Sequence, residues 1–153
     1  MKRIYIFAVI VLMAVVSGSA QQLSKFFDKY DDVEDVTSVY VSKAMLRMMP
    51  DVKTGDMDLS GLSGKLDCIR ILSSNNNDMA RKLKTDADKV LNANGYEVLV
   101  KVSEGKEKTN IYMKSDDKGV NEYFIVNEEP GDFNAILIVG KLTPEDVQKM
   151  VNK

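Results

Sequence analysis

The chain has 153 residues, with 21 Lys and Arg against 23 Asp and Glu, one Cys and no His. The lack of His excludes Ser-His-Asp and Cys-His nucleophilic machinery and zinc sites built on imidazole. A single Cys, Cys68, cannot form a disulfide or a thiolate metal site within one chain. No basic patch or Gly-rich phosphate loop stands out, so we expect neither a nucleic-acid partner nor a nucleotide cofactor.

The first twenty residues are typical of a cleavable secretory signal. They begin with Met1-Lys2-Arg3, continue as an apolar run over residues 4–16 and end on Gly18-Ser19-Ala20. That run is shorter than the ~20 residues that cross a bilayer. We therefore expect only transient membrane contact, cleavage near Ala20 and a periplasmic or otherwise exported mature chain of residues 21–153. The alternative is a signal segment that is retained as an anchor.

The mature chain is predicted to form a single α+β domain, whose first half contains two helices and two strands. Apolar residues at helical spacing indicate a short opening helix: Leu23, Phe26, Phe27 and Tyr30. Residues 36–41 and 65–72 are apolar and β-branched, which favours strands. Between them, Ser42 is expected to cap a helix over residues 43–49, and residues 50–60 are expected to be a loop. Cys68, inside the second strand, is expected to be buried and slow to react.

A long helix is the clearest element of the second half, over residues 73–95. Its apolar stripe consists of Met79, Leu83, Ala87, Val90 and Leu91. We expect Ser74 or Asn75 to cap its start, an ion pair between Asp78 and Lys82, and a stop at Asn94-Gly95.

Four strands are predicted to follow as an antiparallel meander, over residues 96–102, 110–114, 120–126 and 133–139. In the first of them, Tyr96, Val98, Val100 and Val102 are expected to share one face. The last is apolar throughout and is expected to lie inside the sheet. A final helix is expected to begin at Pro144 with Thr143 as its cap. The predicted architecture is α+β: a mostly antiparallel sheet of about six strands, with helices packed on one face.

Two weak metal motifs occur in the first half of the chain. Asp56, Asp58, Ser60 and Asp67 follow the spacing of a calcium loop, with Gly61 at its sixth position. The twelfth ligand is Asp rather than Glu, and Pro50 interrupts the helix that should precede the loop, so a polar surface loop is the preferred interpretation. Met45, Met48 and Met49 have the spacing of a Cu(I) site, but ordinary core packing is preferred there. No metal site, cofactor or catalytic residue is therefore assigned.

Other side-chain pairs have simpler explanations than catalysis. Ser42-Lys43 could suggest a Ser-Lys dyad, but the two residues are neighbours at a helix start, where capping explains the serine. Asp116-Asp117 and Glu128-Glu129 are expected to lie in solvated turns rather than to form a glycosidase pair.

Several segments together resemble a bacterial envelope family known as domain of unknown function 4252. The segments are Phe26 to Tyr30, Val39 to Leu46, Leu59 to Leu72, Gly95 to Glu97, Ile111 to Lys114 and Ile138 to Leu142. The resemblance covers nearly all of the mature chain in order, and implies an exported protein with no assigned activity. Many members look like lipoproteins, whereas this chain has no lipid-accepting Cys directly after the apolar run of residues 4–16.

These observations favour a non-enzymatic, exported protein that binds an envelope protein as its partner. The alternatives are a protein that binds a small molecule or a metal (calcium or copper), and an enzyme that uses carboxylates.

Overall fold

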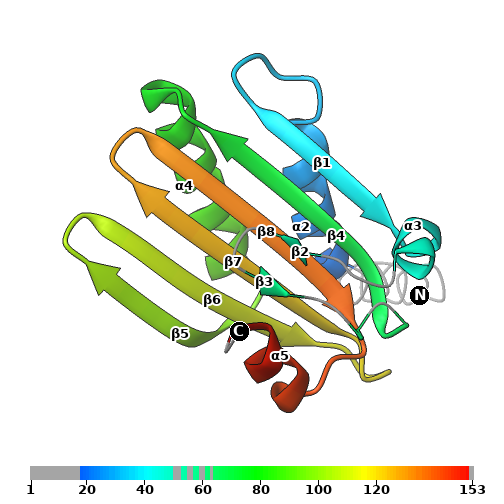
Figure 1. The fold of residues 1–153 in the computed structure, drawn as a ribbon. Helices are drawn as coiled ribbons and strands as arrows, with labels where there is room; N and C mark the ends of the chain where they lie inside the picture. Colours follow the sequence, from blue (N-terminus) through cyan, green and yellow to red (C-terminus); the bar gives the residue numbers. More distant parts are fainter. Residues whose placement is uncertain (1–17, 50–52, 55–56, 59–60, 63, 152–153) are drawn as a thin grey trace, which may run out of the picture.

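The computed structural model describes residues 18–49, 53–54, 57–58, 61–62 and 64–151 (Figure 1). In chain order the elements are α2 (Gly18–Lys29), β1 (Thr37–Ser42), α3 (Lys43–Met48), β2 (Lys53–Thr54), β3 (Met57–Asp58), β4 (Leu66–Ser74), α4 (Asn77–Ala93), β5 (Glu97–Glu104), β6 (Glu107–Ser115), β7 (Asn121–Glu129), β8 (Asp132–Gly140) and α5 (Pro144–Val151). Among these residues, no helix is long and apolar enough to cross a membrane.

Six strands form one antiparallel sheet in the order β1-β4-β8-β7-β6-β5, which confirms the predicted α+β class (Figure 1). The meander β5 to β8 and the interior position of β8, between β4 and β7, are also as predicted. The expected loop over residues 50–60 is wrong in part, because β2 and β3 pair as a small hairpin. The rest of that segment lies outside the described residues.

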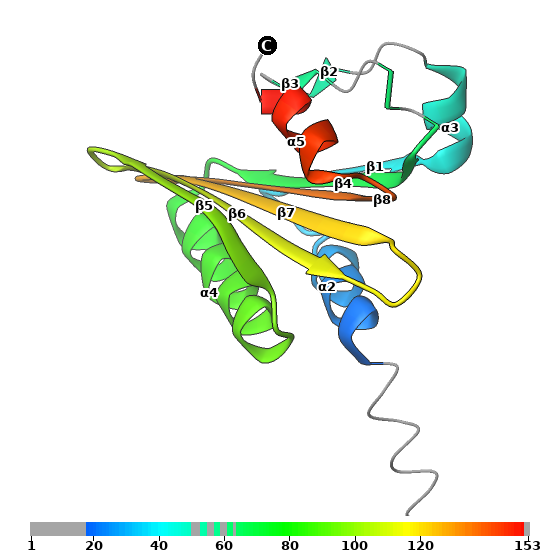
Figure 2. The ribbon, with the colours of Figure 1, turned by 90° about the horizontal axis from the view of Figure 1, so that it is seen from below.

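One face of the sheet is covered by the two longest helices, α2 and α4 (Figure 2). Leu23 and Phe27 of α2 and Tyr30 directly after it are buried there. The rings of Phe26 and Phe27 meet Phe124 of β7 edge to face, with centroids 6.1 and 6.0 Å apart. The predicted stripe of α4 packs on the same face: Leu83, Ala87 and Leu91 are buried, and Met79 and Val90 are half-buried. Ala80, which the stripe did not include, is buried there as well. We call this face the first face.

The second face lies under α3, α5 and the β2–β3 hairpin (Figure 2). Its core joins Leu46 of α3 to Ile69, Tyr123, Ile138 and Leu142. The expectation of helices on one face therefore describes α2 and α4, and the short helices α3 and α5 add cover on the other side. The reason is in β7 and β8, where four successive residues of each strand are buried, so that both faces need cover.

The ends of α4 differ from the prediction in two details. Its cap is Asn76, neither Ser74 nor Asn75: the Asn76 side chain accepts from the backbone N–H of Asp78 and Met79. Asp78 pairs with Arg81 at 2.7 Å rather than with Lys82. The Nζ of Lys82 instead lies 5.9 Å from the ring centroid of Tyr30, which follows α2. At the other end, Asn94 is the C-cap, as expected.

Candidate functional site

The edge strand β5 is exposed along its whole length. Val98, Leu99, Val100 and Val102 are each between 43% and 47% exposed. The predicted alternation of this strand is wrong, because its register against β6 shifts between Val98 and Val100. Val98 lies opposite Tyr112 and Val100 lies opposite Ile111, so the two valines are on different faces. An extra residue in one strand has this effect on every side chain that follows it.

An apolar row crosses the second face and ends at β5. Register places Val39, Ile71, Ile136, Ile125, Ile111 and Val100 side by side, one from each strand. Ile136 and Ile125 at the centre are buried, whereas Val39 and Val100 at the two ends are exposed. The short elements above this face therefore cover the middle of the row and leave both sheet edges bare.

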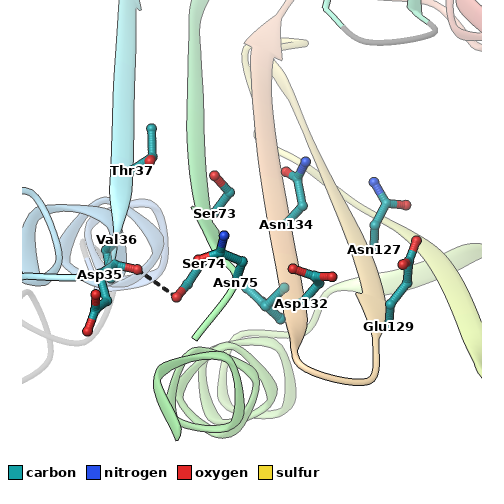
Figure 3. Close-up of a pocket in the computed structure, with 11 residues that line it drawn as sticks. Asp35, Val36, Thr37, Ser73, Ser74, Asn75, Asn127, Glu129, Asp132 and Asn134 are labelled. Carbon is teal, nitrogen blue, oxygen red and sulfur yellow. Dashed lines mark hydrogen bonds between the residues drawn. The ribbon is translucent and has the colours of Figure 1, made fainter. Parts of the chain in front are cut away.

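A polar cleft of about 610 Å³ lies at one end of the sheet (Figure 3). Four uncharged side chains, Thr37, Ser73, Asn134 and Asn127, come from the neighbouring strands β1, β4, β8 and β7 and face the same side (Figure 3). They form the cross-strand row next to the apolar row, and we call them the cleft floor.

The cleft walls are three connections between elements. The connection before β1 contains Asp35, whose φ of 64° is the positive value that Asp tolerates better than most residues. Its carbonyl accepts from Ser74 Oγ at 2.6 Å, and its carboxylate accepts from Asn76 Nδ2 at 3.3 Å. These bonds hold the wall before β1 against the connection from β4 to α4.

The third wall is the β7–β8 turn, which supplies Glu129 and Asp132. This turn lies against the first residue of α4: a Cβ placed on Gly131 would fall 2.5 Å from Asn77 Oδ1, and its φ is +82°. The positive φ of Gly131 favours glycine here, and a larger residue would also have to displace the exposed side chain of Asn77. Among the described residues, the lining contains three carboxylates, from Asp35, Glu129 and Asp132, and no basic side chain.

The side-chain oxygens of Asn127 and Asn134 in the cleft floor differ in whether a hydrogen-bond donor reaches them. Asn127 Oδ1 accepts from Thr109 Oγ1 at 2.9 Å, which leaves its amide N–H groups toward the cleft side. Asn134 Oδ1 is enclosed and has no hydrogen-bond partner among the described residues. Unpaired buried acceptors are rare and costly in folded proteins, so the described residues leave one acceptor of the floor uncompensated.

The perturbed ionisable groups lie away from the cleft. Burial, and a 2.7 Å hydrogen bond from its hydroxyl to Glu122, raise the pKa of Tyr96. Burial also raises the pKa of Glu122. Cys68 is half-buried rather than buried as predicted, since its cross-strand neighbour on edge strand β1 is the small Ser42. Burial raises the pKa of its thiol, which favours the less reactive protonated form.

The two calcium candidates that the structure describes, Asp58 and Asp67, have separate contacts. Asp58 pairs with Lys53 in the β2–β3 register, and Asp67 of β4 forms an ion pair with Lys43 at 3.2 Å. Asp56 and Ser60 lie outside the described residues. Over the described ranges, no group of three His, Cys, Asp or Glu side chains is placed to hold a metal.

The interpretation of the methionines as core residues is wrong. Met45, Met48 and Met49 are all exposed, Met48 by 78%, and only Leu46 of this helix is buried. A six-residue helix presents one narrow face to the sheet, and Leu46 occupies it. Ser42 Oγ accepts from the Met45 backbone N–H at 3.2 Å, so this serine is a helix cap as expected.

The paired carboxylates have structural contacts. Asp116 accepts from the backbone N–H of Lys118 and Val120 in a turn, as expected. Glu128 lies inside β7 rather than in a turn, and pairs with Lys84 at 2.9 Å.

Sequence reasoning missed the cleft floor because its four residues are far apart in the chain. Each looks like an ordinary polar position at a strand end. A signal was present in β8, where Asn134 interrupts an otherwise apolar strand between Phe133 and Ala135. Only the cross-strand register shows that three other polar side chains lie in the same row.

Comparison with protein families gives one match. The family model described as domain of unknown function (DUF4252) matches residues 30–150. This chain belongs to that family. No curated protein and no solved structure matches the chain. The DUF4252 match spans the domain from the end of α2 to α5, including β5 and every residue of the cleft.

Proposed function

We propose that this DUF4252 protein is exported and acts without catalysis, by binding an extended segment of another envelope protein along β5. The observation that carries the proposal is the exposure of four apolar side chains on this edge strand. Edge strands of monomeric proteins are usually protected, by short length, lysines, prolines or bulges, because an open edge accepts further strands. β5 has eight residues, one Lys and no Pro, and its bulge protects only the first part.

The regular part of β5, from Val100 to Glu104, offers both backbone and side-chain contacts. Its residues pair one for one with β6 up to the turn that Glu104 and Glu107 close. In a two-residue hairpin the closing pair is hydrogen-bonded and the pairs then alternate. The backbone N–H groups of Lys101 and Ser103 therefore point away from β6, toward an added strand.

The side chains on this part of β5 define the chemistry of the partner. Val100 ends the apolar row of the second face, and Val102 lies on the same face, opposite Thr109. An added strand with apolar residues at alternate positions would continue that row and bury both valines. The partner class that fits is therefore an extended, alternating apolar segment, which binds by strand addition.

Support for export comes from the basic start, short apolar run and small exit residues of the first twenty positions. Helix α2 begins at Gly18, so cleavage after Ala20 would remove its first three residues. The core residues Leu23, Phe26, Phe27 and Tyr30 would all remain. The intact mass of the protein recovered from cells tests this part. A mass that corresponds to a chain starting at Gln21 supports export, and a mass that retains residues 1–20 contradicts it.

Strand addition is tested by photo-cross-linking in intact cells from a reactive residue at Leu99. The same residue at Arg81, exposed on α4, is the positional control. Lys101→Pro removes an outward N–H at an edge position that tolerates proline, and Lys101→Ala is its matched control, because alanine keeps that N–H. We expect one discrete adduct from Leu99 that Lys101→Pro abolishes and Lys101→Ala preserves. An adduct that survives Lys101→Pro, or that forms equally from Arg81, contradicts the proposal.

A further inference from the structure

We propose that the polar cleft is a binding site for a small aliphatic ammonium compound, independently of the strand-addition role of β5. The cleft volume of about 610 Å³ is in the range of small-molecule sites, roughly 300–1,000 Å³. It lies at the end of the sheet where β4, β7 and the start of β8 meet, and β5 contributes no residue to its lining.

The charge of the lining selects a cation. Asp35, Glu129 and Asp132 stand around an uncharged floor, and no Lys or Arg of the described ranges lines this cleft. Arg81, Lys84, Lys106 and Lys108 line a second hollow on the far side of the β7–β8 turn. The two hollows share Glu129, Asp132 and Phe133, and Asp35 belongs to the cleft alone. A ligand in the cleft therefore meets carboxylates, which a positive charge neutralises.

The geometry favours an organic ammonium group over a metal ion. No group of three carboxylates in the described part of the chain is close enough to hold a metal, so the cleft acids are dispersed around its rim. A chain of several atoms can place an N–H donor against more than one of them. An ammonium group has three donors and no acceptor, which suits acceptors spread over a cleft of this size.

The floor supplies the second set of contacts. Asn134 Oδ1 is enclosed, so the accepting groups of the floor are the hydroxyls of Thr37 and Ser73, which lie in the same cross-strand row. A hydroxyl has two acceptor lone pairs and can accept from the N–H donors of an ammonium group. Phe133 is the only aromatic residue of the lining and is buried, so the cleft offers no exposed ring for stacking a sugar or a base.

Calorimetry and backbone-amide chemical shifts of the full chain purified from cells test the assignment. Putrescine is the probe, glucose is an uncharged hydroxyl-rich comparison, and calcium chloride tests metal binding. We expect one putrescine site, with shift changes centred on Thr37, Ser73, Asn127 and Asn134. Binding of glucose or calcium more tightly than putrescine, or shifts centred elsewhere, would overturn the proposal.

Variants separate the cleft from general attraction to an acidic protein. Ser73→Ala and Asp132→Asn should each weaken putrescine binding by about tenfold or more, because each removes a partner of a charged donor. Asp117→Asn makes the same charge change in the β6–β7 turn, outside the cleft, and should change the affinity by less than about twofold. Equal weakening by Asp117→Asn and Asp132→Asn overturns the site. The Lys101→Pro variant should bind putrescine normally, so failure of strand addition and failure of this site are distinguishable.

Discussion

The two faces of the sheet differ in the length of the helices that cover them. On the first face, α4 and α2 are 17 and 12 residues long and carry continuous apolar stripes. On the second face, α3 and α5 are 6 and 8 residues long, and α3 buries a single side chain. Long helices can extend across several strands, whereas short ones shield only the centre. This difference explains why the apolar row of the second face is exposed at its two ends, on β1 and β5.

Substitution in the first face should have the largest effect on stability. Leu83 is fully buried at the centre of the α4 stripe. Leu83→Ala removes its packing and leaves a cavity between two rigid layers, so we expect a loss of about 2–5 kcal/mol in unfolding free energy. Chemical denaturation measures this loss. A change below about 0.5 kcal/mol would show that the first face is not the tightly packed one.

The equivalent truncation on the second face sharpens the comparison. Leu46 is also fully buried, but it belongs to the short helix α3. Because a short helix can move into the space that is left, we expect Leu46→Ala to cost about 2 kcal/mol, at the lower end of the range for such truncations. Denaturation of both variants under the same conditions tests the order. A larger loss for Leu46→Ala than for Leu83→Ala would reverse it.

The sequence predicted the first face better than the second, for a physical reason. A stripe over 17 residues repeats often enough to identify its buried side, and the α4 prediction of Leu83, Ala87 and Leu91 is confirmed. In six residues the pattern does not repeat, so three methionines beside Leu46 were equally compatible with the core. Cross-strand rows are invisible in the sequence, because each residue comes from a different strand. Both the cleft floor and the bulge of β5 depend on register, and neither was predicted.

The attachment of α5 to the second face should weaken at low pH. Asp146 accepts from the Thr143 backbone N–H at 2.9 Å and from Lys65 Nζ at 3.0 Å. The Thr143 N–H, followed by Lys65, lowers the pKa of this carboxyl to about 2 from an ordinary 3.8. A lowered pKa in the folded state means that the stabilisation is fully present above about pH 4 and is lost as the pH falls toward 2.

Thermal unfolding between pH 6 and pH 2 tests this dependence. Asp146→Asn should be less stable than the unmodified protein at pH 6, and the difference between them should shrink as the pH approaches 2. Glu145→Gln removes a neighbouring charge without removing the contacts to Thr143 and Lys65, and is the matched control. A stability difference between Asp146→Asn and the unmodified protein that is constant over this range would contradict the prediction.

The smallest effect on stability is expected at the edge of the second face. Val100 is 43% exposed, and its one described strand neighbour in register is Ile111. Val100→Thr keeps the β-branched shape and replaces a methyl group with a hydroxyl, so it should change the unfolding free energy by no more than about 0.5 kcal/mol. The same change should weaken the Leu99 cross-link if an added strand buries Val100, because the hydroxyl would then enter an apolar contact. A stability loss comparable to that of Leu46→Ala would instead show that Val100 is already part of the core. In that case β5 would not be free to accept another strand. The apolar row of the second face would then be covered at its β5 end as well as at its centre.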